Sequence, residues 1–188
     1  MAATNSKLDE AIRRLSRNDT TLTSLDLKGN IFGNQVGDEG ALRLAEALTQ
    51  NSTLTSLNLI FNKMGGEGAG RLAEALVINS TLITLDLSSN QVGDEGAARL
   101  AEALAINSSL TTLDLWNNEV GDEAVGRLAE ALATNSSLTQ VHFDSDMNTR
   151  LLADAHLDRN KDNLEKKSAS LCFMLLPSLS LGGVEPSE

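Results

Sequence analysis

Apolar and polar positions recur along this chain with a period of 28 residues. A typical unit reads LITLDLSSNQVGDEGAARLAEALAINSS, and each copy opens with the same apolar spacing. The copies begin at Leu22, Leu54, Leu82, Leu110 and Leu138. The first copy has four additional residues near positions 31–34, and the last soon diverges. A fixed period of this length predicts a repeat protein in which every unit stacks on the next.

Each unit contains two hydrophobic periods. In LTTLDL, which opens one unit, the spacing predicts a short strand whose inward side chains are Leu113 and Leu115. The second part of a unit has alanine and leucine at helical spacing, as in GDEGAARLAEAL at 93–104 of the unit that begins at Leu82. Asp94 is the expected N-cap of this helix. Because helices need more room than strands, stacking these units predicts an α/β fold. It is a right-handed solenoid bent into a horseshoe arc, with parallel strands on the concave face and helices on the convex face.

Asparagine occupies two repeated places in the unit. The spacing LxxLxLxxNxV matches the leucine-rich repeat pattern, in which the asparagine amide satisfies backbone groups where the chain turns. This first set is Asn30, Asn62, Asn90 and Asn118. A second set fits the glycosylation motif N-x-[ST], but we interpret it as structural because most of it comes from one repeated turn. That set is Asn18, Asn51, Asn79, Asn107 and Asn135.

The reiterated motif LTxLDLxxNxVGDEGAxRLAEAL resembles the ribonuclease-inhibitor type of leucine-rich repeat, which is also found in NOD-like receptors. The resemblance covers roughly residues 22–143. It implies a scaffold that binds proteins through its concave, strand-lined face.

The flanks predict caps for the array. Residues 1–20 contain an amphipathic segment that we expect to be an N-terminal capping helix, followed by the repeats at 21–146. We expect a C-terminal capping helix at 147–167. Residues 168–188 form an apolar tail that either covers the last repeat or stays flexible. A helix ending in Asn-Asp ahead of the repeats is similar to tropomodulin, an actin-capping protein, although these repeats are more regular.

Charge and composition narrow the partners. The net charge of −11 lies entirely in residues 21–146, which hold 17 acidic and six basic side chains, and this argues against a nucleic-acid surface. A single cysteine excludes a disulfide scaffold and a multi-cysteine zinc site. There is no apolar run long enough to span a membrane and no secretory signal at the start, so we expect a cytoplasmic protein that binds no membrane.

Catalytic and metal-binding patterns are missing from the sequence. The histidines are His142 and His156, the cysteine is Cys172, and no phosphate-binding glycine loop is present. The segment from Asp158 begins like a calcium loop but has Asn163 where that loop requires glycine. We therefore expect no enzyme activity, no cofactor and no metal.

One outward column of the predicted strands is rich in carboxylates. Adjacent parallel strands lie about 4.8 Å apart, and carboxylates stacked so closely cost stability, so the fold is not expected to need them. The column is Asp26, Asn58, Asp86, Asp114 and His142. It predicts an acidic strip for a basic protein or peptide. The alternative is that repeat duplication copied a tolerated surface residue.

The single tryptophan is the second candidate feature. Trp116 stands at an outward position where sister units have Ser88 and Lys28, and Ile60 and Phe61 lie two strands away. Exposed tryptophan is enriched at binding hot spots, although Trp116 could instead pack on a neighbouring loop.

These observations predict a non-enzymatic scaffold that binds a basic protein or peptide on its acidic concave face. Two alternatives are a GTPase-activating regulator of the Ran-activator type and a tropomodulin-like actin-capping protein. The repeated arginines stand in the predicted helices rather than in loops, which disfavours the Ran-activator type.

Overall fold

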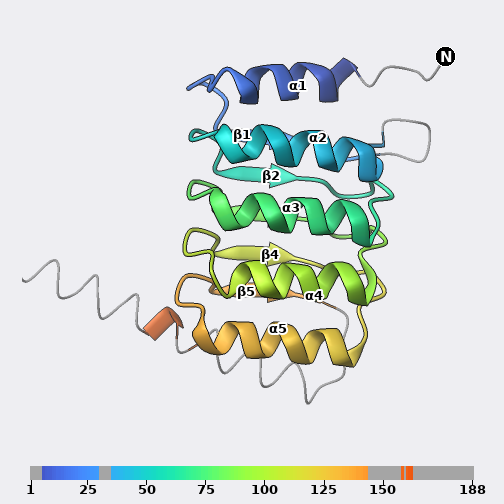
Figure 1. Cartoon of the computed structure of the whole chain (residues 1–188), viewed down its shortest axis with the longest axis vertical. Coiled ribbons are helices and arrows are strands. Elements are labelled where there is room, and N and C mark those ends of the chain that lie inside the picture. Colours follow the sequence, from blue (N-terminus) through green and yellow to red (C-terminus); the bar gives the residue numbers. More distant parts are fainter. Residues whose placement is uncertain (1–5, 30–34, 144–157, 159, 163–188) are drawn as a thin grey trace, which may run out of the picture.

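The computed structural model describes residues 6–29, 35–143, 158 and 160–162 as a regular stack of strand–helix units (Figure 1). The four additional residues of the first repeat, most of the expected C-terminal cap and all of the expected tail lie outside the described residues. The helices are α1 (Ser6–Ser16), α2 (Gly37–Gln50), α3 (Gly66–Ile78), α4 (Gly93–Leu104) and α5 (Asp122–Thr134). The strands are β1 (Ser24–Asp26), β2 (Ser56–Asn58), β3 (Thr84–Asp86), β4 (Thr112–Asp114) and β5 (Gln140–His142).

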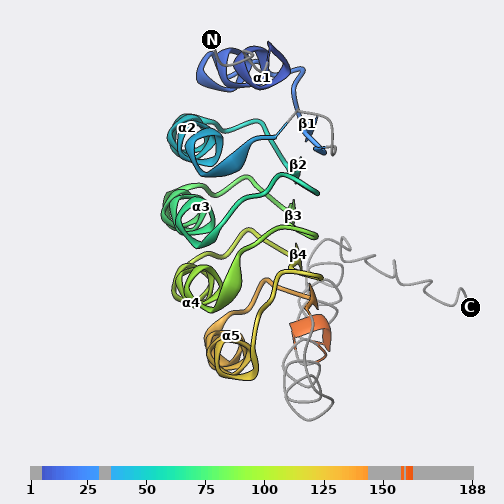
Figure 2. The same ribbon diagram turned by 90° about the vertical axis from the view of Figure 1, so that its right-hand side faces the viewer.

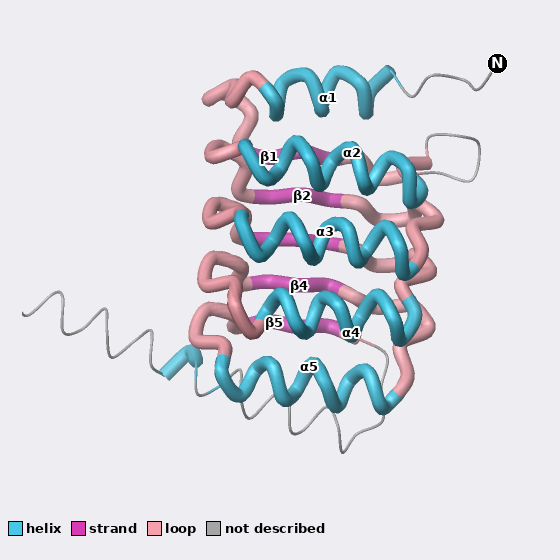
Figure 3. The backbone as a smooth tube through the Cα atoms, viewed as in Figure 1, coloured by secondary structure: helices cyan, strands magenta, loops and turns pink. Residues whose placement is uncertain are grey.

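All five strands are parallel and follow one another in chain order within a single open sheet. Figure 2 shows the sheet from its end, with the strands on the narrower inner side and the helices on the wider outer side. The tube in Figure 3 shows the same alternation of strand and helix along the chain. The predicted α/β leucine-rich repeat fold is therefore confirmed.

Leucine and alanine fill the space between the two layers. The central leucines of successive strands align in register, as in Leu57, Leu85 and Leu113, and all three are buried. Alanines such as Ala69 and Ala97 are fully buried between helices, where a larger side chain would keep the helices apart. The chain is therefore rich in leucine and alanine because every repeat adds the same core layer.

The first asparagine set ties each turn after a strand to the repeat before it. Asn90 donates from Nδ2 to Leu59 O at 2.9 Å, and its Oδ1 accepts from Met64 N at 3.1 Å. Asn62 and Asn118 make equivalent bonds and are completely buried. The predicted role of this set is confirmed for these three residues, whereas Asn30 lies outside the described residues.

The second asparagine set forms a continuous ladder where helices lead into strands. Asn107 Nδ2 donates to Leu76 O at 2.8 Å and to Asn79 O at 3.1 Å, both in the preceding repeat. Its Oδ1 accepts from Leu110 N at 2.8 Å. Asn51, Asn79 and Asn135 are buried in the same way. The amides of these four residues are occupied by structure, which confirms their structural role, whereas Asn18 is exposed and its Nδ2 donates to Gln50 O at 3.3 Å.

The ladder continues beyond the regular repeats at Asn160, which belongs to the expected C-terminal cap. Its Nδ2 donates to the carbonyl oxygens of Asn135 and Leu138, each at 2.9 Å, and only 2% of the residue is exposed. Asn160 therefore satisfies the carbonyl oxygen of Asn135, as a further ladder asparagine would, and adds a bond to Leu138 O.

The expectation that Asp94 is the N-cap of its own helix is wrong. Helix α4 is preceded by Val92, and Asp94 Oδ1 instead accepts from Gly121 N at 2.7 Å, where α5 begins. Asp38 likewise reaches across to the start of α3, accepting from Gly65 N and Gly68 N at 2.7 and 3.0 Å. Both carboxylates directly follow a glycine in the left-handed region, with φ of 58° at Gly37 and 59° at Gly93.

Helix α1 packs against α2 at the start of the array. After it, Asp19 Oδ1 accepts from the hydroxyl and the amide of Thr21 at 2.6 and 2.9 Å. Asp19 Oδ2 accepts from Arg14 Nε at 2.6 Å. The hydrogen bonds from Thr21 and Arg14 lower the pKa of Asp19 to about 2. In the described part of the chain, no helix is long and apolar enough to cross a membrane.

Replacing a ladder asparagine should destabilise the whole stack. Asn107→Ala removes two donated bonds and leaves buried backbone groups without partners, so we expect a loss of about 2–4 kcal/mol in the free energy of unfolding. Urea denaturation followed by circular dichroism measures this loss. Ser108→Ala changes the exposed neighbour and should leave the stability within about 0.5 kcal/mol of wild type. Equal effects of the two substitutions would contradict the role of the ladder.

The Asp19 cluster makes a pH-dependent contribution to stability. Because the folded-state pKa is lowered from 3.8 to about 2, the contribution is present above pH 4 and is lost as the pH falls towards 2. We expect wild type to exceed Asp19→Asn in its urea midpoint at pH 7, and the difference to shrink between pH 4 and pH 2. A difference that does not change with pH would contradict the assignment.

Candidate protein-binding surface on the strand side

The predicted outward column lies in register across the sheet. Asp26, Asn58, Asp86, Asp114 and His142 pair as Cα neighbours along the five strands. The two at the ends of the column are exposed and the three between them are partly exposed. His142 Nδ1 lies 3.2 Å from Asp114 Oδ2. The structure therefore brings all five candidate residues together in one row.

The fold uses this column, contrary to the expectation that it does not need it. Asp114 Oδ1 accepts from Trp116 N at 2.9 Å, which closes a turn directly after the strand. Asp86 accepts in the same way from both the amide and the hydroxyl of Ser88. The same turn is closed at Asp26 and at Asn58, where an amide oxygen replaces the carboxylate. The hydrogen bond explains an oxygen acceptor at this position, but the asparagine shows that the negative charge is not required.

Trp116 and Phe61 are exposed on the loops that follow the strands. Trp116 is 56% exposed and Phe61 is 50% exposed, so neither is packed into the core. The backbone beneath them is bound to neighbouring repeats: Ser89 N donates to Trp116 O at 2.8 Å, and Phe61 N donates to Ser88 O at 3.3 Å. Ile60, beside Phe61, is partly exposed. The prediction of an exposed tryptophan is confirmed, and its role in binding stays a prediction.

Phe61 has an unusual backbone conformation for a bulky residue. Its φ is 58°, in the left-handed region, where the equivalent residues of the next two repeats are Ser89 and Asn117. Asparagine enters this region readily, whereas a bulky residue there is an outlier. The Nζ of Lys28 lies 6.0 Å from the centre of the Phe61 ring. A large ring displayed on a fixed turn, next to a cation, is a feature that the fold itself does not explain.

Most of the acidic charge lies on the helices and not on the strand side. Helices α2 to α5 carry eleven acidic and four basic side chains, which is −7 of the net −11. Part of this charge is paired on the surface, as in Arg99 with Glu95 at 2.7 Å and Arg127 with Glu123 at 3.2 Å. The strand side is acidic, but the net charge of the chain is not evidence that the strand side is the binding surface, because most of this charge lies on the helices.

A second exposed feature, on the outer side, was not predicted from the sequence. Leu42, Val77, Ile78 and Ile106 are all more than a third exposed. The sequence signal was available, because these residues stand at three positions of the unit where the remaining repeats have small or polar residues. In the described part of the chain, no group of three or more acidic, cysteine or histidine side chains could hold a metal ion. His156, Cys172 and most of the calcium-like segment lie outside it.

Stacked parallel strands, outer helices and asparagine ladders define a leucine-rich repeat domain. The chain belongs to the TMOD/LMOD leucine-rich domain family, because the model of that family matches residues 4–162. The repeat type is therefore that of tropomodulin and leiomodin, whereas these comparisons do not show the features specific to the ribonuclease-inhibitor and NOD-like receptor type.

Two solved structures have the same fold. One is titled leiomodin-1 actin-binding site 2; it has a TM-score of 0.82 and 24% identity, and the match covers 89% of this chain and 96% of that chain. The other is the tropomodulin C-terminal domain from Caenorhabditis elegans, with a TM-score of 0.75 and 20% identity, covering 87% of this chain and 98% of that chain. No curated protein sequence gives a significant match.

Substitutions of Asp114 can distinguish the structural role of the column, which is to close the turn after the strand, from the effect of its negative charge. Asp114→Asn keeps an oxygen acceptor for Trp116 N, so we expect the free energy of unfolding to stay within about 0.5 kcal/mol of wild type. Asp114→Ala removes the acceptor and should cost about 0.5–1.5 kcal/mol. Thermal and urea denaturation of both variants measure these values. An asparagine variant as unstable as the alanine variant would show that the carboxylate charge itself is needed.

Proposed function

We propose that this chain is a non-enzymatic interaction module that binds actin in the cytoplasm. The observation that carries the proposal is the match of the TMOD/LMOD leucine-rich domain over residues 4–162. It is supported by the leiomodin-1 structure, which is an actin-binding site by its title and is covered almost completely by this chain. The tropomodulin-like alternative of the sequence analysis is thus preferred to a Ran-activator or a receptor-type scaffold.

Within this proposal, the strand side and its loops are the contact surface. Trp116 and Phe61 are large, exposed and mounted on turns that neighbouring repeats hold in place. Such residues lose little conformational freedom on binding, so most of the apolar area that they bury contributes to affinity. Ile60 adds a partly exposed aliphatic side chain beside Phe61.

The row of side chains next to these loops gives the surface its charge preference. Asp26, Asp86 and Asp114 offer carboxylate oxygens to the partner, and Asn58 and His142 lie in the same row. Each aspartate in the row uses Oδ1 to close its own turn. Oδ2 of Asp26 and Asp86 is the oxygen that would receive a basic side chain. We propose that a basic segment of the partner lies along this row.

Replacing the tryptophan tests both the partner and the surface. Trp116→Ala should fold normally, because the side chain is exposed, and should weaken actin binding at least about tenfold, which corresponds to about 1.4 kcal/mol. Co-sedimentation with actin filaments and fluorescence anisotropy with labelled actin monomers measure the affinity. Filament elongation assays show whether binding also caps filament ends.

Arg127→Ala is the matched control, because Arg127 is exposed on the helix side. Its affinity should equal that of wild type. If the wild-type chain binds neither monomeric nor filamentous actin, the proposed partner is wrong. If it binds actin and Trp116→Ala binds equally well, the partner stands and the strand-side surface is wrong.

A further inference from the structure

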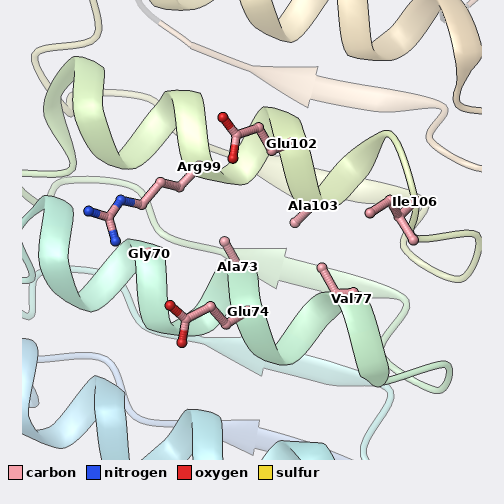
Figure 4. Close-up of a pocket in the computed structure, with 8 residues that line it drawn as sticks. All are labelled: Gly70, Ala73, Glu74, Val77, Arg99, Glu102, Ala103 and Ile106. Atoms are coloured by element: carbon pink, nitrogen blue, oxygen red, sulfur yellow. The ribbon is translucent and has the colours of Figure 1, made fainter.

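The outer aliphatic patch is the set Leu42, Val77, Ile78 and Ile106 on the helix side. Val77 and Ile106 line a cavity of about 330 Å³ between α3 and α4, together with Ala73 and Ala103. Figure 4 shows these two aliphatic side chains at one end of the cavity and Arg99 at the other. Leu42 and Ile78 line the adjoining cavity of about 460 Å³ between α2 and α3. The patch therefore extends across three helices.

The repeat itself does not require these side chains. Ile78 and Ile106 are 63% and 65% exposed, and the same position holds Gln50 in the first repeat and Thr134 in the fourth. Leu42 likewise stands where the other repeats have Gly70, Ala98 and Gly126. Exposed aliphatic residues gathered in this way indicate a surface that is covered by something else.

The last described residues lie at the edge of the solenoid where helices lead into strands, and the outer aliphatic patch reaches the same edge. Asn160 is bonded to Asn135 O, one ladder step beyond the end of α5. Ile106 directly precedes the ladder residue Asn107, two steps away, and Ile78 precedes Asn79, three steps away. Successive repeats lie about 4.8 Å apart at the strands and about 10 Å apart at the helices, so two steps place Ile106 about 10–20 Å from Asn160.

The length of the following chain matches this distance. Eight residues separate Asp162 from Leu171, where the segment LCFMLL begins. A random coil of that length would have an r.m.s. span of about 16 Å and a maximum of about 30 Å. The linker therefore allows the apolar segment to reach Ile106 and to continue towards Ile78.

Charge favours this occupant over a second copy of the chain. Helices α3 and α4 together carry five acidic and two basic side chains, so two such faces would repel each other. Residues 168–184 contain no charged side chain. Tethering also raises the effective concentration of the segment to about the millimolar range, so even weak apolar contacts keep it bound.

We propose that the apolar segment at 171–176 docks in cis on the outer aliphatic patch and covers it. The proposal is independent of actin binding, because it concerns the opposite side of the solenoid. It gives the outer side of the array an intramolecular partner and leaves the strand side free.

The single cysteine provides the test, because Cys172 lies inside the docking segment. We expect its thiol in the full-length chain to react with Ellman's reagent at least about tenfold more slowly than in a synthetic peptide of residues 168–188. The double variant Ile78→Gln/Ile106→Thr installs residues that flanking repeats already carry and should restore the rate of the peptide. Trp116→Ala, on the opposite side, should react as slowly as wild type.

Three outcomes would overturn the proposal. Rapid reaction in the wild-type chain shows that the segment does not dock. Slow reaction in both wild type and the double variant places the segment elsewhere, such as on the last repeat. Protection that disappears on dilution shows docking between copies and not in cis. Urea denaturation of the double variant confirms that it is folded, so that each rate refers to the native array.

Discussion

Each repeat leaves backbone groups open at its two turns, and a buried asparagine in a neighbouring repeat satisfies them. Asn107 shows the constraint most directly, since its amide nitrogen bonds to the preceding repeat while its oxygen holds the following turn. An asparagine is suited to this position because one short side chain carries both donors and an acceptor. Without the preceding repeat, the Nδ2 group would lose both carbonyl partners, and only the hydrogen bonds within its own unit would remain. The core leucines give the array its stability, but the ladders decide that the units stack in one register.

The strand side combines this rigid framework with residues that the framework does not explain. The turn after each strand needs an oxygen acceptor, which accounts for Asp86, Asp114 and also Asn58. It does not need a tryptophan at 116 or a phenylalanine in the left-handed region at 61. Binding is the function that such residues support best. The repeats therefore hold the exposed aromatic side chains of Phe61 and Trp116 in fixed positions.

The repeated fold and the strand register could be predicted from the sequence because they follow from one period applied several times. The outward row from Asp26 to His142 is one example, because strands that start at the same point of each repeat pair in register and place equivalent residues side by side. The role of Asp94 could not be predicted in this way. Whether its carboxylate caps its own helix or the next one depends on the left-handed turn at Gly93, which the helical spacing does not contain. Asn160 escaped notice because the last unit no longer keeps the period, and the outer aliphatic patch because it appears only when the same position is compared between repeats.

The crossed caps have a consequence for how the solenoid holds together. Asp38 joins α2 to α3, and Asp94 joins α4 to α5. The corresponding residue between α3 and α4 is Gly66, which has no side chain to offer, and there Gln91 N donates to Met64 O at 2.8 Å instead. The two outer joints thus have a carboxylate bond that the central joint lacks. A substitution at Asp38 or Asp94 can remove one of these carboxylate bonds, whereas the central joint depends on its main-chain bond and on the asparagine ladders, so Asn107 is the side chain through which mutation would weaken the middle of the array.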